Sequence, residues 1–172
     1  VVMPLNPLLG QAELGHILEV MQPKLIISES PKVQLPAFGA LPDLLHRFSP
    51  NTKLIFTAVT EDEAKSAYSS AIDLATFRKL GVKSAHPIIR APEDEAVIMF
   101  SSGMSGHPKG ISINEQTILA NCEYSVQAMR YSTDDVVLSG LPFSHVFGQV
   151  VVMLAGLMAG ATLRIAPRPL PD

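Results

Sequence analysis

The chain has 172 residues, 47% of them hydrophobic, so it is long enough to bury one sizeable core and too short for two ordinary domains. Thirteen basic and sixteen acidic residues give a net charge of -3, and no run of lysine or arginine is present, which argues against a nucleic-acid partner. Cys122 is the only cysteine, which excludes an internal disulfide and a cysteine-based zinc site and favours the cytoplasm or another reducing compartment.

The first half of the chain alternates helix and strand signals. After the break at Asn6-Pro7, apolar residues recur at helical spacing at Leu14, Ile17, Leu18 and Met21. The apolar runs 24–28 and 52–57 predict buried strands. A second helix between them is expected from Leu41, Leu44, Leu45 and Phe48. This alternation is typical of βαβ units.

Two more helices and a linker are expected before residue 95. Acidic residues 61–63 predict a helix start, because negative charge stabilises a helix N-terminus. Residues 73–81 end as a helix should, with basic residues followed by glycine. Residues 83–94 contain two prolines and are expected to lead the chain to an apolar strand at 96–100.

A glycine-rich loop directly follows this strand. Its residues are Phe100, Ser101, Ser102, Gly103, Met104, Ser105, Gly106, His107, Pro108, Lys109 and Gly110. Glycines let backbone N–H groups approach an anion, serine hydroxyls add donors, and Lys109 supplies a positive charge, so the segment predicts a phosphate-binding loop. It is not a Walker loop, because no hydroxyl residue follows Lys109, and not a nucleophile elbow, because His107 replaces the last glycine.

The remaining elements complete an α/β pattern. Residues 110–113 predict the second arm of a hairpin, and Asn114 is expected to cap a helix that runs through Leu119, Cys122, Val126 and Met129. Strands are expected at 136–141 and 161–165, on either side of a buried helix at 146–160. The predicted fold is therefore a three-layer α/β domain with a largely parallel sheet.

The buried helix is too short to cross a membrane. It has about 15 residues, whereas a spanning helix needs roughly 20, so no transmembrane segment is expected. Gly156 and Gly160 are expected to allow close packing or to end this helix.

A second motif precedes the buried helix and reads Leu141-Pro142-Phe143-Ser144-His145-Val146-Phe147-Gly148. A histidine beside an apolar run is commonly a core or capping residue, and that role stays open for His145. A serine hydrolase that uses Ser105, His145 and Asp134 or Asp135 is an alternative, but the missing elbow glycine argues against it.

The two motifs together resemble the adenylate-forming enzymes, which include acyl-CoA synthetases, aryl-CoA ligases, luciferases and adenylation domains of peptide synthetases. The loop is similar to that family's Ser-Ser/Gly-Gly-(Ser/Thr)-(Ser/Thr)-Gly-x-Pro-Lys-Gly sequence. Residues 141–148 are similar to its Leu-Pro-x-(Phe/Tyr)-His-x-x-Gly motif, and residues 4–7, Pro-Leu-Asn-Pro, are a weaker match. The three matches come in family order and span nearly the whole chain.

The resemblance implies an acid-CoA ligase. Such an enzyme uses ATP and Mg²⁺ to convert a carboxylic acid into an acyl-adenylate, which the thiol of coenzyme A then intercepts. The resemblance implies that residues 101–110 bind the nucleotide, that Lys109 is catalytic, and that Phe143, His145 and Gly148 lie beside the acid. It also implies that residues 1–172 are part of an N-terminal AMP-binding domain whose C-terminal partner is absent, so the chain alone is expected to be inactive.

Two departures from the family pattern leave one further alternative open. Met104 stands where the family has serine or threonine, and Asn114-Glu115 replaces a frequent Thr-His. Both are compatible with a noncatalytic family member that serves as an interaction or nucleotide-binding module.

Overall fold

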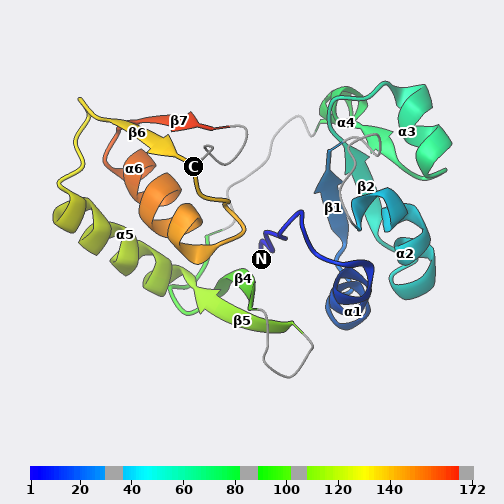
Figure 1. The fold of residues 1–172 in the computed structure, drawn as a ribbon, viewed down its shortest axis with the longest axis horizontal. Helices are drawn as coiled ribbons and strands as arrows, with labels where there is room; N and C mark the ends of the chain where they lie inside the picture. The colour runs from blue at the N-terminus through cyan, green and yellow to red at the C-terminus, as the bar shows by residue number, and fades with distance from the viewer. Residues whose placement is uncertain (30–36, 82–88, 102–107, 167–172) are drawn as a thin grey trace. The chain divides into compact units, whose positions relative to one another are not determined.

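The structure is a computed structural model that describes residues 1–29, 37–81, 89–101 and 108–166. Figure 1 shows its helices and strands. The described residues form two compact units. One contains residues 7–29 and 37–81, and the other contains residues 1–6, 89–101 and 109–166.

The unit formed by residues 7–81 is a parallel sheet with its helices. Its elements are α1 (Gln11–Met21), β1 (Leu25–Ser28), η1 (Phe38–Ala40), α2 (Leu41–Phe48), β2 (Lys53–Phe56), α3 (Glu61–Ala67), β3 (Ile72–Asp73) and α4 (Leu74–Lys79). The strands pair in the order β1-β2-β3, with Ile26 opposite Leu54 and Ile55 opposite Ile72. The core comprises Leu14, Ile17, Leu18, Leu41, Leu45, Leu54, Ile55 and Phe56.

Most predictions for this unit are confirmed, including the first two helices and the buried strand β2. The prediction that residues 24–28 form a buried strand is wrong in its burial, because Leu25 and Ile27 of β1 are 41% and 61% exposed. Both side chains lie on one face of an edge strand, and no described element of this unit covers that face. The two-residue strand β3 was not predicted, since it is too short to show a periodicity.

The other unit contains both motifs. Its elements are β4 (Glu95–Ser101), β5 (Lys109–Asn114), α5 (Glu115–Met129), β6 (Val136–Ser139), η2 (Phe147–Leu154), α6 (Ala155–Met158) and β7 (Thr162–Ile165). β4 and β5 form the predicted antiparallel hairpin, and β6 pairs with β7 in parallel across the η2–α6 crossover. Val2 joins the other side of β4, where its N–H donates to Ala96 O at 2.9 Å. The α/β class with parallel strand pairing is thus confirmed.

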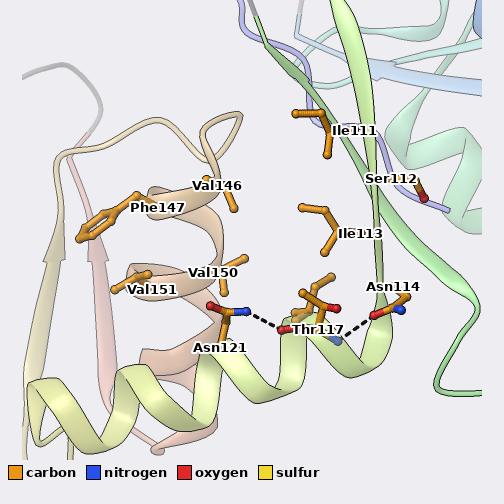
Figure 2. A pocket seen from close by; sticks show the side chains of 11 residues that line it. Ile111, Ser112, Ile113, Asn114, Thr117, Asn121, Val146, Phe147, Val150 and Val151 are labelled. Atoms are coloured by element: carbon orange, nitrogen blue, oxygen red, sulfur yellow. Dashed lines mark hydrogen bonds between the residues drawn. The ribbon is translucent and has the colours of Figure 1, made fainter.

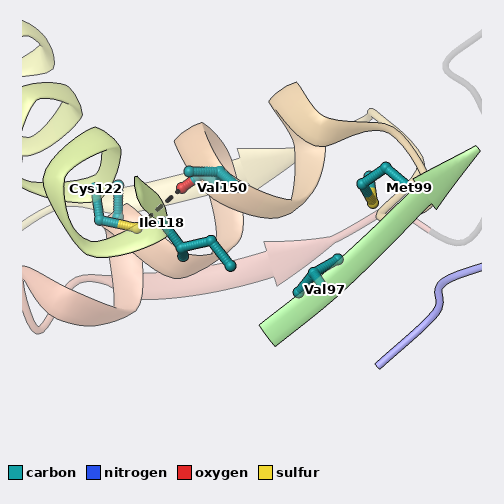
Figure 3. Packing of buried hydrophobic residues seen from close by; sticks show 6 residues of the cluster. Val97, Met99, Ile118, Cys122 and Val150 are labelled. Atoms are coloured by element: carbon teal, nitrogen blue, oxygen red, sulfur yellow. Dashed lines mark hydrogen bonds between the residues drawn. The ribbon is translucent and has the colours of Figure 1, made fainter. Parts of the chain in front are cut away.

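The core of this unit joins the hairpin to the helices (Figure 3). Val97 and Met99 come from β4, Ile118 and Cys122 from α5, and Val150 from η2. Ala155 of α6 completes the buried set. These contacts place α5 and η2 against the strand that enters the glycine-rich loop.

The helix predicted at 146–160 is present, with two differences. Its first part, η2, is a π-helix, which leads into α6. Only one face is buried, since Val150 and Ala155 are covered while Phe147 and Leu157 are 44% and 54% exposed. Gly160 has a φ of 75° and ends the helix as expected, because glycine adopts this left-handed conformation without strain. None of the described helices is long and apolar enough to cross a membrane.

Candidate functional site

The hairpin β4–β5 fixes both ends of the predicted phosphate loop. Ser101, the last residue of β4, lies directly opposite Lys109, the first residue of β5. Directly opposed residues of an antiparallel pair have Cα atoms about 4.5–5.5 Å apart, so the loop starts and finishes at one place. The loop residues Ser102, Gly103, Met104, Ser105, Gly106 and His107 lie outside the described residues.

Lys109 presents an exposed cation at this point. Its side chain makes no ion pair within the described part of the chain. Pro108 precedes it, and Gly110 follows it in β5 opposite Phe100. An unpaired ammonium at the mouth of a loop can act as a point charge for an anion such as phosphate.

The second motif forms the turn that leads into η2. The backbone N–H of His145 donates to Pro142 O at 3.0 Å, and its carbonyl accepts from the N–H of Gln149 at 3.0 Å. The side chain takes part as well, because the N–H of Phe147 donates to His145 Nδ1 at 3.2 Å. The capping role left open for His145 is therefore confirmed. With Nδ1 as an acceptor, a neutral imidazole carries its proton on Nε2, which can donate to a ligand.

Gly148 has a packing reason of its own. A Cβ atom at this position would lie 2.6 Å from Pro142 O and 3.2 Å from Leu141 Cβ, which leaves no space for any side chain. Phe143, in the same turn, is half-buried. The packing explains why the motif ends in glycine, and the roles of Phe143 and Gly148 toward a substrate stay predictions.

A cavity of about 470 Å³ opens between β5, α5 and η2 (Figure 2). Its size falls within the range of about 300–1,000 Å³ that is usual for small-molecule sites. The lining residues are Ile111, Ser112, Ile113, Asn114, Thr117, Ile118, Asn121, Val146, Phe147, Val150 and Val151.

Both motifs contribute walls to this cavity. Lys109, Ile111 and Ile113 occupy alternate positions of β5 and therefore share one face of the strand. In Figure 2, Ile111 and Ile113 point toward Val146 and Val150 on the opposite wall. That wall begins directly after His145, although neither His145 nor Phe143 is among the described residues that line the cavity. The glycine-rich loop and the histidine motif thus border the same cavity.

Hydrogen bonds hold the α5 wall in place. Asn114 Oδ1 accepts from the N–H of Thr117 at 2.8 Å and caps α5 as predicted. Threonine is also a good N-cap residue, so asparagine here preserves the local structure that the family's usual residue would give. Asn121 Nδ2 donates to Thr117 O at 2.8 Å one turn further on.

A buried thiol connects α5 to the π-helix. Cys122 Sγ donates to Val150 O at 3.7 Å, and both residues are buried. Burial raises the pKa of the Cys122 thiol, which keeps it in the neutral donor form. A π-helix pairs its backbone groups over a longer span than an α-helix, and the thiol adds a donor at one of its carbonyls.

Sequence reasoning missed the apolar lining of the cavity. Ile111, Ile113, Val150 and Val151 had been interpreted only as parts of a strand and a buried helix. The alternation of Lys109, Ile111 and Ile113 was the available signal, since it places the loop cation and two apolar residues on one face.

The residues of the serine hydrolase alternative are not brought together by any described contact. Asp135 Oδ2 accepts from the N–H and Oγ of Ser132 at 2.7 and 2.9 Å, which explains Asp135 as a turn residue. Ser105 lies outside the described residues, so the alternative has no support from this geometry.

Relatives of known name cover most of the chain. It is 25% identical to 4-coumarate–CoA ligase 4 of Arabidopsis thaliana over 95% of its own length and 28% of the relative's. It is 26% identical to long-chain-fatty-acid–CoA ligase 1 of Homo sapiens over 88% of its own length and 23% of the relative's. The chain therefore spans about a quarter of the length of these curated relatives.

A solved structure shares the fold. ATP-bound MatB from Rhodopseudomonas palustris superposes with a TM-score of 0.74 at 21% sequence identity, over the whole of this chain and 31% of that one. The sequence model of the AMP-binding enzyme family matches residues 1–172. The chain belongs to the AMP-binding enzyme family.

Proposed function

We propose that the protein is an ATP-dependent acid-CoA ligase, and that these 172 residues form part of its N-terminal domain. A carboxylate oxygen attacks the α-phosphorus of ATP, the bond to the β-phosphate oxygen breaks, and pyrophosphate leaves. The thiolate of coenzyme A then attacks the acyl carbonyl, and AMP leaves as the thioester forms. The family and the names of the two relatives, both CoA ligases, support this reaction class.

The chain's own groups would act by position and charge. Lys109 and the loop residues Ser101, Ser102 and Ser105 would hold the β- and γ-phosphates, while the loop's backbone N–H groups supply further donors. Mg²⁺ would accompany the nucleotide on its phosphate oxygens, as this ion commonly does. His145 would offer its Nε2–H toward the acid from the turn that it caps.

One observation carries the proposal. Lys109 lies at the mouth of the loop and shares a strand face with Ile111 and Ile113, which line the cavity. Along a strand, Ile111 lies about 7 Å beyond Lys109. An anion at the lysine and an apolar acyl group in the cavity would therefore be neighbours, which an adenylation reaction requires.

Exchange of labelled pyrophosphate into ATP tests the proposal, because only the adenylation step is needed for it. We expect exchange by the complete protein that depends on an added carboxylic acid, whereas the 172-residue chain alone would lack activity. Binding of ATP without exchange for any acid would instead support the noncatalytic alternative. Of the two departures behind that alternative, Asn114 keeps its capping role and Met104 remains.

A further inference from the structure

The cavity between β5, α5 and η2 offers no charge to a ligand. Its lining is apolar on the β5 and η2 walls, where Ile111, Ile113, Val146 and Val150 face one another (Figure 2). None of the described lining residues is Lys, Arg, His, Asp or Glu. An ionised group that entered this space would lose its hydration without gaining an opposite charge, which is strongly unfavourable.

The polar side chains of the cavity are already engaged on the α5 backbone. Asn114 Oδ1 accepts from the Thr117 N–H, and Asn121 Nδ2 donates to Thr117 O, both at 2.8 Å. These bonds hold the first turns of α5 and reduce the donors that remain for a second carboxylate. The cation nearest along β5 is Lys109, at the loop end of the strand and two positions before Ile111.

We propose that this cavity takes the apolar tail of a monocarboxylic acid and selects against acids that carry a second charge on that tail. The inference rests on the proposed function, which puts the reacting carboxylate at the loop end of β5. It adds the substrate class, because the charge of the lining and the direction of the strand both point away from dicarboxylic acids. Ile111 and Ile113 are then specificity-determining residues.

Octanoate and octanedioate are suitable probes, because they differ only in the second carboxylate. Calorimetric titration of the complete protein with each acid reads the cavity without requiring catalysis. We expect octanoate to bind at least about tenfold more tightly, since the second charge of octanedioate would be desolvated without a partner. Equal affinity, tighter binding of octanedioate, or no binding of octanoate would overturn the inference.

A charge placed in the wall should change this preference. Ile111 is 54% exposed, so Ile111→Arg does not enter the folded core. We expect it to shift the octanoate to octanedioate affinity ratio at least about tenfold toward the dicarboxylate. Ser112→Arg is the matched control, because its side chain points away from the cavity in Figure 2 and the ratio should stay within about twofold of the wild type. An unchanged ratio in folded Ile111→Arg would contradict the inference.

Pyrophosphate exchange separates this inference from the proposed function. If octanoate binds selectively but no acid supports exchange, the proposed function fails and the selectivity of the cavity stands. If exchange occurs with octanoate and octanedioate at equal kcat/KM, the proposed function stands and the selectivity fails.

Discussion

Ser101 and Lys109 face each other across the terminal pair of the β4–β5 hairpin. The strand that enters the glycine-rich loop and the strand that leaves it are therefore tied together by backbone hydrogen bonds at the loop's base. The same hairpin packs on α5 and η2 through Val97 and Met99. The proposed cation for phosphate thus stands on a supported element, as a preorganised binding group requires.

The two glycines of the η2–α6 segment should respond differently to alanine. In the complete protein, Gly148→Ala should lower the free energy of unfolding by about 1–3 kcal/mol, because its Cβ would lie 2.6 Å from the backbone oxygen of Pro142. Gly156→Ala is the matched variant. Its Cβ would lie 3.6 Å from Val137 Cγ2, an ordinary contact, so the change should be neutral or stabilise by up to about 1 kcal/mol. Urea denaturation measures both, and equal effects would show that the Pro142 contact is not limiting.

Loss of the α5 cap should cost stability without touching the cavity's apolar walls. Asn114→Ala should lower the free energy of unfolding by about 0.5–2 kcal/mol, because the N–H of Thr117 loses its acceptor. Asn114→Asp keeps an acceptor oxygen and should retain most of the wild-type stability. The comparison of the two denaturation midpoints checks the cap, and an alanine variant as stable as the wild type would argue against it.

The strands and helices that carry the two motifs could be predicted from local sequence. The hairpin around the loop, the cap at Asn114 and the end at Gly160 follow from residue chemistry over a few positions. The π-helical form of η2 could not be predicted, because the apolar run at 150–152 has no feature that separates π from α pairing. The exposure of Leu25 and Ile27 was also beyond reach, since it depends on which elements cover the sheet.

The candidate site was predictable only in part. The loop and the histidine motif are continuous in sequence, so their residues could be named in advance. The cavity is built from three elements that meet only in the fold, and His145 proved to use its side chain to cap η2. Local sequence does not determine whether a polar side chain bonds to its own backbone or to a ligand.

Asp73 should make stability depend on pH. Hydrogen bonds from the side chain and backbone of Thr76, and then from Ala75, lower the pKa of Asp73 below its usual value of 3.8. A lowered pKa means that its contribution is complete above pH 3.8 and is lost as the pH falls through the folded-state value. Asp73→Asn should therefore be less stable at neutral pH and lose less stability in acid. If denaturation midpoints of variant and wild type fall in parallel between neutral and acidic pH, the carboxylate does not contribute in this way.

Met104 is the loop position where this chain departs most from its family. If a hydroxyl there contacts phosphate, Met104→Thr in the complete protein should lower the KM for ATP or raise kcat. The gain should lie within about 1.5–3 kcal/mol, the value of one hydrogen bond to a charged group. Steady-state exchange kinetics at varied ATP concentration measure it. Unaltered constants would mean that phosphate is held without this position, and a loss of activity would mean that Met104 has a packing role.

The role of Lys109 in nucleotide activation is the central claim, and acid-dependent ATP–pyrophosphate exchange by the complete protein tests it most directly. Lys109→Ala removes the exposed cation at the base of the loop, and Lys53→Ala removes an exposed lysine from the start of β2 as a control. We expect Lys109→Ala to reduce kcat/KM by about one to two orders of magnitude, in line with the loss of a charge-assisted contact, while Lys53→Ala keeps the wild-type value. Exchange at the wild-type rate in a folded Lys109→Ala variant would contradict the assignment of this loop as the phosphate site.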